Sequence, residues 1–274
     1  MRAAWLALTC VHRRLPLHRR LVEFYLYREH LIIITELQGP DLLSHLLNLP
    51  EGPRGTVFGT GKLRTLARQM LELLRYLDEQ GVTHCDLKTS NICLSPDLES
   101  FRLIDFGSTV LWRDEKNSYT QARWYRAPEI SLGLPWDGKV DVWSLGCILA
   151  EVVVGEPLFR HNHIEAVLAA HNAIIGPIPE WMIMHTPALS ALFFTAEGRH
   201  YQIDPTDLPK GAYLLEPRTD VGIRGLLAEA AEAGGYGDMT SFIEFVTSLL
   251  TIDPSMRPTA AEAMQHPWMT ETTP

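Results

Sequence analysis

The stretch from residue 84 to residue 107 constrains the fold most, because it holds several polar side chains at fixed spacing around an apolar segment. Its first half contains Asp86, Lys88 and Asn91, and its second half ends in Asp105 followed by Phe and Gly. An aspartate beside a phosphoryl acceptor can orient a hydroxyl group and take its proton, and a nearby lysine can neutralise the transferred phosphate. An asparagine and a second aspartate can bind the metal ion that bridges two phosphates. The spacing therefore indicates phosphoryl-transfer chemistry.

Further motifs follow in the same chain. They are Ala127-Pro128-Glu129, an Asp141-Val142-Trp143 segment on an expected helix, and Arg257-Pro258. In this order, the motifs resemble the catalytic loop, the DFG segment and the later signatures of eukaryotic protein kinases. The resemblance implies an α+β protein-kinase-like fold, with a mostly helical C-lobe and an incomplete N-lobe β-sheet. The competing interpretation is an unrelated α/β domain in which the motifs occur by chance.

The resemblance implies chemical roles for the polar residues of the first stretch. Asp86 would orient the substrate hydroxyl and accept its proton, and Lys88 would contact the transferred phosphate. Asn91 and Asp105 would bind the Mg2+ that accompanies ATP. For each of these residues, the alternative is an ordinary role in loop capping or turn hydrogen bonding.

Other residues match the family in supporting positions. Glu36 and Leu37 resemble the kinase hinge, where backbone groups meet the adenine edge of ATP. The resemblance also implies that the ring of His84 packs under the DFG turn and that Gly107 gives this turn its flexibility. It implies that the Asp141 carboxylate holds the catalytic-loop backbone, and that Glu129 forms an ion pair with Arg257.

Two arginines, Arg123 and Arg126, precede the Ala-Pro-Glu motif, as in the CMGC group of kinases, where they hold the peptide-positioning loop. Tyr119 lies just upstream, so a phosphate added there by autophosphorylation could meet these arginines. The alternative is a plain solvent-facing loop. Ala122 stands where related kinases carry Thr or Ser, whose hydroxyl bonds the catalytic Asp and Lys in the family. The missing hydroxyl predicts that Asp86 is oriented less firmly, at a cost on the order of 1 kcal/mol for one hydrogen bond.

The spacing from Asp105 to Glu129 matches the LAMMER (CDC-like) kinases without a gap, and those kinases also lack Arg at the position of Cys85. Residues 168–179 align with their LAMMER-x-x-GPIP stretch, of which Leu-Ala and the whole Gly-Pro-Ile-Pro are present. Alone, this element also fits an amphipathic helix stopped by a proline. LAMMER-like is the preferred subfamily, and the DYRK dual-specificity kinases come next. The family implies Ser/Arg-rich proteins as substrates and a nuclear address.

The region before the hinge departs from the family pattern. Kinases cover ATP with a Gly-rich loop, anchor it with a strand lysine and pair that lysine with a helix glutamate. Here the first glycine is Gly39 and the first lysine is Lys62. The only acids before the hinge are Glu23 and Glu29. None of the three roles can therefore be assigned to a residue.

This departure sets the expected domains and leaves two explanations open. Residues 1–38 would be a remnant of the N-lobe, and residues 39–274 would be the C-lobe with an irregular insertion at about 181–238. A truncated gene model or fragment leaves the C-lobe motifs intact, whereas a degenerate pseudokinase erodes them, so the intact motifs favour truncation or recent loss. The alternative function is a catalytically inactive kinase or pseudokinase that acts as a protein-interaction module.

Hydrophobic periodicity predicts the secondary structure. Strands are expected at 21–27 and 31–36, and the apolar surface of the second should be exposed because the lobe that would cover it is incomplete. The segment 141–154 is almost wholly apolar and should form a buried helix. Further helices are expected at 41–47, 62–80, 164–175, 239–250 and 259–265.

The composition excludes some classes of function. A net charge of −9 disfavours a nucleic-acid binder and suits a basic protein substrate. No apolar run approaches the roughly 18 residues that a membrane span needs. The four cysteines form no CxxC pair, which predicts reduced thiols in an intracellular protein of the cytoplasm or nucleus.

Overall fold

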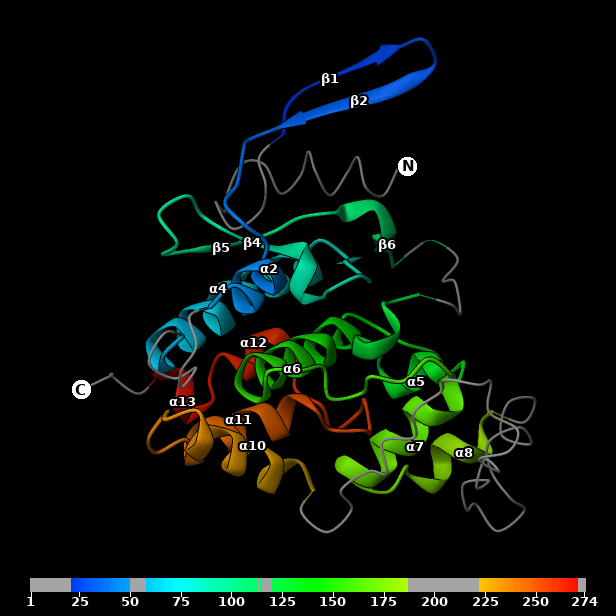
Figure 1. The fold of residues 1–274 in the computed structure, drawn as a ribbon. Coiled ribbons are helices and arrows are strands. Elements are labelled where there is room, and N and C mark those ends of the chain that lie inside the picture. Colours follow the sequence, from blue (N-terminus) through cyan, green and yellow to red (C-terminus); the bar gives the residue numbers. More distant parts are fainter. Residues whose placement is uncertain (1–20, 50–57, 113, 115–119, 187–221, 271–274) are drawn as a thin grey trace.

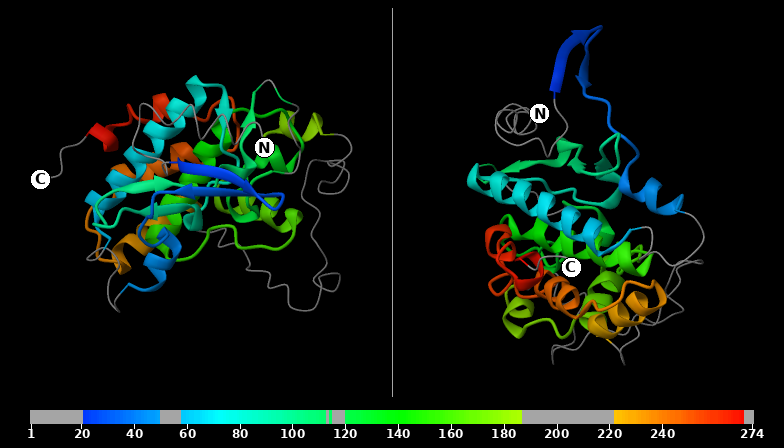
Figure 2. Two further views of the ribbon diagram at one scale, coloured as in Figure 1. Left: turned by 90° about the horizontal axis from the view of Figure 1, so that it is seen from above. Right: turned by 90° about the vertical axis from the view of Figure 1, so that its left-hand side faces the viewer.

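The computed structural model describes residues 21–49, 58–112, 114, 120–186 and 222–270. Most of these residues form a helical body, and one two-stranded hairpin stands away from it (Figure 1). The right-hand view of Figure 2 shows the same separation from the side. None of the described helices combines the length and the apolar character that a membrane crossing requires.

The hairpin consists of β1 (Leu21–Tyr27) and β2 (His30–Thr35), which pair antiparallel. The predicted strands are confirmed, because β-branched and aromatic residues favour the extended backbone. The turn places Arg28 and Glu29 at positive φ, 46° and 66°. A hairpin of two strands buries little apolar surface. The exposed Leu31, Ile33 and Ile34 confirm the predicted exposure of the second strand. Large apolar residues of β1 are exposed as well: Val22, Phe24, Tyr25, Leu26 and Tyr27.

Residues 36–40 lead from the hairpin to the body. The N–H of Gly39 donates to the backbone oxygen of Leu94 at 2.9 Å. A Cβ atom at this position would lie 2.9 Å from the same oxygen, so the close approach requires glycine. Helix α2 (Leu42–Leu47) then begins as predicted, and the Asp41 side chain caps its N-terminus.

Helix α4 (Thr60–Glu79) confirms the helix predicted at 62–80. It ends before Gly81, whose φ of +67° suits glycine. In the right-hand view of Figure 2 this helix runs across the upper part of the body. Its apolar residues at helical spacing are buried: Leu63, Leu66, Ala67, Met70, Leu73, Leu74 and Leu77.

Two small strand pairs lie on the side of α4 that faces the hairpin (Figure 1). Strand β4 (Ile92–Leu94) pairs antiparallel with β5 (Phe101–Leu103), and β3 (Val82–Thr83) pairs antiparallel with β6 (Val110–Leu111). The first residue of β4 lies opposite the last residue of β5. The residues just before β4 and just after β5 therefore end up side by side.

Helix α6 (Lys139–Val154) occupies the centre of the body (Figure 1). Every residue from Val140 to Val153 is buried. Helices α4, α10 (Gly222–Ala233) and α11 (Thr240–Leu249) all contact it. The predicted buried helix is confirmed, because an all-round apolar helix is stable in water only when neighbours cover every side.

The region at 181–238 differs from its predicted irregular structure. Helix α8 (Glu180–Met184) extends into it, and α10 occupies its C-terminal part. The prediction was wrong there because flanking glycines hid a short helical repeat, whose members lie four positions apart and are buried: Ile223, Leu227 and Ala231. Residues 187–221 lie outside the described residues.

The other helices complete the body. They are α5 (Pro128–Ser131), α7 (Ile164–Ile174), α12 (Ala260–Ala263) and α13 (Pro267–Thr270). Helices α7 and α11 match their predictions closely. The predicted last helix at 259–265 is shorter in the structure, and a capping box between Thr259 and Glu262 fixes its start.

Candidate active site

The loop between β3 and β4 brings Asp86, Lys88 and Asn91 together. Asp86 Oδ2 accepts hydrogen bonds from Lys88 Nζ at 2.8 Å and from Asn91 Nδ2 at 2.9 Å. Asn91 Nδ2 also donates to the backbone oxygen of Asp86 at 2.9 Å, so the loop closes on itself. The side chains of Asp86 and Lys88 are 15% and 29% exposed. The ion pair is therefore shielded on most sides and still open to solvent.

Asp105 reaches the same place through the pairing of β4 with β5. The N–H of Ile104 donates to the backbone oxygen of Asn91 at 2.9 Å, which sets Asp105 beside Asn91. Asp105 has φ 61° and ψ 74°, a left-handed conformation that is costly for a non-glycine residue and is enriched at functional sites. Its Oδ1 accepts from the N–H of Gly107 at 3.2 Å. Asp105 is exposed, so its carboxylate is open to solvent.

Asn91 and Asp105 offer the oxygen ligands that Mg2+ prefers. Because the amide nitrogen of Asn91 is bound to Asp86, the amide oxygen points away from that carboxylate and is available to a cation. Among the described residues, no group of three or more His, Cys, Asp or Glu side chains is arranged to hold a metal ion. Magnesium bound through nucleotide phosphates needs only one or two protein ligands. The residues present fit such an ion.

His84 supports the DFG turn from beneath. Its ring packs edge-on against Phe106, with centroids 4.9 Å apart. Its Nδ1 accepts from the N–H of Asp86 at 3.2 Å, so the proton sits on Nε2, which donates to the backbone oxygen of Ile104 at 3.2 Å. Burial lowers the pKa of His84 to about 4. The neutral ring thus joins the loop of Asp86 to the segment of Asp105.

Asp141 holds the start of the catalytic loop. Its carboxylate accepts from the N–H of His84 at 2.7 Å and from the N–H of Cys85 at 3.0 Å. Cys85 is fully buried and has φ +65°, so the loop bends sharply there. Burial raises the pKa of Asp141 to about 7, although the two N–H donors favour the charged form.

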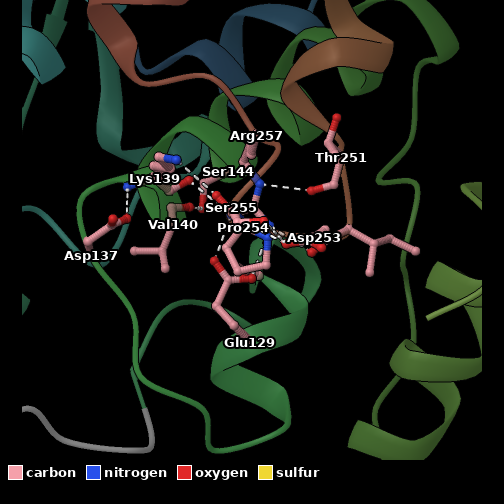
Figure 3. A network of polar contacts seen from close by, with 12 residues as sticks. Glu129, Asp137, Lys139, Val140, Ser144, Thr251, Asp253, Pro254, Ser255 and Arg257 are labelled. Carbon is pink, nitrogen blue, oxygen red and sulfur yellow. Dashed lines mark hydrogen bonds and ion pairs between the residues drawn. The ribbon is translucent and has the colours of Figure 1, made fainter. Parts of the chain in front are cut away.

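Glu129 and Arg257 form the ion pair that the family pattern implies. Arg257 Nη1 and Nη2 donate to the two carboxylate oxygens at 2.6 Å and 2.9 Å, in the two-pronged geometry that makes such pairs strong. Figure 3 shows the pair inside a wider network, in which Arg257 also donates to the backbone oxygens of Thr251 and Lys139. Both side chains are at most 1% exposed. The stretch from Asp105 to Glu129 is called the activation segment below. The ion pair ties the end of this segment to the loop before α12.

The activation segment is held by Gln121, which no sequence pattern singled out. Its backbone has φ +66°. Its Nε2 donates to the backbone oxygen of Val140 and to Ser144 Oγ, both at 3.0 Å, and its Oε1 accepts from the N–H of Ala127 at 2.9 Å. A lone glutamine has no periodic or spacing signature, so only the structure reveals this role.

The two arginines of the activation segment bind backbone oxygens. Arg126 is 3% exposed and donates to the oxygens of Thr120 at 2.9 Å and Gln121 at 2.8 Å. Arg123 donates to the backbone oxygen of Asn162. These contacts fix the turn η4 (Arg123–Tyr125). Tyr119, the predicted phosphorylation site, lies outside the described residues.

Glu36 and Leu37 follow β2 directly, and Leu37 is 87% exposed. Shortly after them, Asp41 forms an isolated β-bridge with Cys93 of β4. Because β4 begins immediately after Asn91, one strand links the hinge-like segment to the candidate magnesium ligands. Contact of Glu36 and Leu37 with adenine stays a prediction.

Comparison with known proteins decides the family. The family model described as "Protein kinase domain" matches residues 11–269. The chain belongs to the protein kinase family. A solved structure described as a kinase domain has a TM-score of 0.79 to this chain at 25% identity, and covers 98% of this chain and 83% of its own. The predicted α+β kinase fold is thus confirmed.

Its curated relatives are CMGC-like kinases. The serine/threonine-protein kinase ppk5 of Schizosaccharomyces pombe is 36% identical over 90% of this chain and 28% of its own length. Dual specificity tyrosine-phosphorylation-regulated kinase 3 of Mus musculus is 33% identical over 93% of this chain and 43% of its own. Serine/threonine-protein kinase AFC3 of Arabidopsis thaliana is 32% identical over 88% of this chain and 64% of its own length. The chain spans less than two thirds of the length of each.

Proposed function

We propose that this kinase domain transfers the γ-phosphate of MgATP to serine or threonine hydroxyls of proteins, and to tyrosine during autophosphorylation. The observation that carries the proposal is the convergence of Asp86, Lys88 and Asn91 through hydrogen bonds of 2.8 to 2.9 Å, with Asp105 brought alongside by the β4–β5 pair. Such a cluster of a base, a cation and metal-binding oxygens is what phosphoryl transfer needs.

Each residue has a role that follows from its contacts. Asp86 accepts the proton of the incoming hydroxyl, because its carboxylate is held in place by Lys88 and Asn91 and is partly open to solvent. Lys88 moves from Asp86 to the transferred phosphate, a shift that its flexible side chain allows. Asn91 and Asp105 would hold Mg2+, which when bound neutralises charge on the phosphates.

The finer assignment is a LAMMER-like kinase that acts on Ser/Arg-rich proteins in the nucleus or cytoplasm. Its support is the segment leading to Glu129, the intact Gly-Pro-Ile-Pro at 176–179 and the likeness to AFC3. A net charge of −9 suits a basic substrate. The likeness to a DYRK-type relative keeps that subfamily as the neighbouring choice.

The decisive experiment is phosphotransfer from labelled ATP to a Ser/Arg-rich peptide, with an acidic peptide of equal length for comparison. Asp86→Asn and Asp105→Asn should each lower the rate at least about a hundredfold, as expected when a base or a metal ligand is lost. Asp238→Asn is the matched control. Asp238 is exposed, and an asparagine oxygen at this position can still accept the hydrogen bond from the N–H of Thr240. An unchanged rate in Asp105→Asn would show the metal assignment to be wrong.

A second candidate is a non-catalytic interaction module. It is favoured by one observation, namely that Ala122 stands where related kinases carry the Thr or Ser hydroxyl that bonds the catalytic Asp and Lys. Thermal unfolding distinguishes the two candidates, because a ligand that binds only the folded state raises its stability with concentration. A magnesium-dependent shift on adding ATP supports the kinase; the absence of any shift up to millimolar ATP supports the module.

A further inference from the structure

A buried cluster of hydrogen bonds lies directly behind the catalytic loop. Its members are Thr89, Tyr125 and Glu151, which are 1%, 6% and 3% exposed. Tyr125 Oη donates to Glu151 Oε2 at 2.7 Å, and Thr89 Oγ1 lies 3.3 Å from Glu151 Oε1 and 3.1 Å from Tyr125 Oη. The proposed phosphoryl-transfer scheme uses none of these three groups.

The three residues come from three distant parts of the chain. Thr89 directly follows Lys88 and opens η2 (Thr89–Asn91). Tyr125 belongs to η4 of the activation segment, and Glu151 lies on the buried helix α6. The cluster is thus a junction between the catalytic loop, the activation segment and the most enclosed helix of the body.

The chemistry of the cluster fixes which atoms hold the protons. Burial, reinforced by the neighbouring Glu151 carboxylate, raises the pKa of Tyr125, so its phenol stays protonated and donates to Glu151. The Thr89 hydroxyl has one proton, which goes to Glu151 Oε1 or to the tyrosine oxygen. Removing a hydroxyl donor from a buried carboxylate is costly, so the loss of either hydroxyl should weaken the junction.

Helix α6 therefore holds the catalytic loop at both ends. Asp141 binds the backbone at His84 and Cys85, and Glu151 binds Thr89. The two acidic residues lie ten positions apart on the helix, which is about 15 Å along the helix axis. Asp86 and Lys88 lie on the stretch of chain between these two anchors.

We propose that Thr89 is a positioning residue, which through Glu151 and Tyr125 sets the conformation of Lys88 and couples it to the activation segment. The catalytic part of this inference rests on the proposed kinase function. A change at η4 then reaches the loop of Lys88 through the hydroxyl groups of Tyr125 and Thr89.

Hydrogen exchange of backbone amides tests the coupling in the whole chain. Thr89→Val removes only the hydroxyl and keeps the branched shape, and it should speed exchange about fivefold or more at 86–92 and at 120–127, as expected for one lost hydrogen bond. Tyr125→Phe should have the same effect at both segments. Thr89→Ser should restore slow exchange. Thr65→Val is the control, since its hydroxyl serves only an exposed turn of α4.

The exchange pattern separates positioning from a general loss of stability. Faster exchange at the two coupled segments, with α11 unchanged, supports the inference. Equal acceleration throughout the body, or acceleration confined to the mutated segment, would overturn it. If Thr89→Val fails to fold, Tyr125→Phe gives the same decision from the other side of the junction.

Kinetics then tests the catalytic part. Thr89→Val should lower kcat for phosphotransfer at least about fivefold, with the KM for ATP unchanged and kcat rescued by Thr89→Ser. A wild-type kcat in Thr89→Val would overturn the inference. If the wild-type chain transfers no phosphate while the exchange pattern is present, the proposed function fails and the structural coupling stands.

Discussion

The β1–β2 hairpin and helix α6 have similarly apolar sequences and opposite environments. Every residue of α6 from Val140 to Val153 is buried, whereas Leu26 in the hairpin is 71% exposed. The difference lies in the neighbours, because three helices contact α6, whereas among the described strands β1 and β2 pair only with each other. Apolar composition thus predicts a demand for burial, and only the surrounding elements satisfy it.

The largest effect is expected inside the body, at the pair of Glu129 with Arg257. Arg257→Met leaves a buried carboxylate without its partner, which should lower the free energy of unfolding by about 3–5 kcal/mol. Urea denaturation measures it. Arg75→Met is the matched control, because the ion pair with Glu79 is exposed and should contribute less than about 1 kcal/mol. If both variants lost the same free energy of unfolding, burial of the Glu129–Arg257 pair would not explain its stabilising effect.

A pair of truncations tests the comparison directly. Leu145→Ala in α6, at a fully buried site, should lower the free energy of unfolding by about 2–5 kcal/mol. Leu26→Ala in the hairpin should change it by no more than about 0.5 kcal/mol. A large loss from Leu26→Ala would show that another part of the chain covers the hairpin in solution.

The pH dependence of stability should reveal the buried ring of His84. Its pKa of about 4 in the folded protein lies below the ordinary value, so between pH 4 and 6.5 the unfolded chain binds the proton and the folded one does not. The neutral, buried ring of His84 therefore contributes fully to the free energy of unfolding above pH 6.5, and this contribution is lost as the pH falls to 4. The stability difference between wild type and His84→Gln should therefore grow by about 3 kcal/mol as the pH rises across that window. A difference independent of pH would contradict burial of this ring.

The smallest effect on stability is expected at the hairpin surface, where the consequence is solubility. Ile33→Lys, at a 46% exposed site, should leave the unfolding free energy within about 0.5 kcal/mol of wild type. It should reduce self-association, because exposed apolar strands promote aggregation. Light scattering at rising concentration gives the measurement. A wild-type chain that stays monomeric would contradict the exposure of this surface.

The comparison also shows which parts of the fold could be predicted. Long periodic or all-apolar segments such as α4 and α6 were predictable, because their patterns need no knowledge of the neighbours. Helix α10 was missed, because its pattern is short and glycines flank it. Spacing brought Asp86, Asn91 and Asp105 forward as candidates, whereas Thr89 stayed unnoticed beside them, since one threonine in a loop carries no pattern.

The sequence by itself determined the order of the motifs, the regular elements with strong periodicity, and the chemistry that the polar residues could perform. The family resemblance already implied that Asp141 holds the catalytic loop, but only the tertiary structure decided that α6 also binds this loop through Glu151 and that Gln121 holds the activation segment. The physical reason is that these hydrogen bonds join residues far apart in the chain. Their partners are chosen by the packing of whole helices, which no local pattern records.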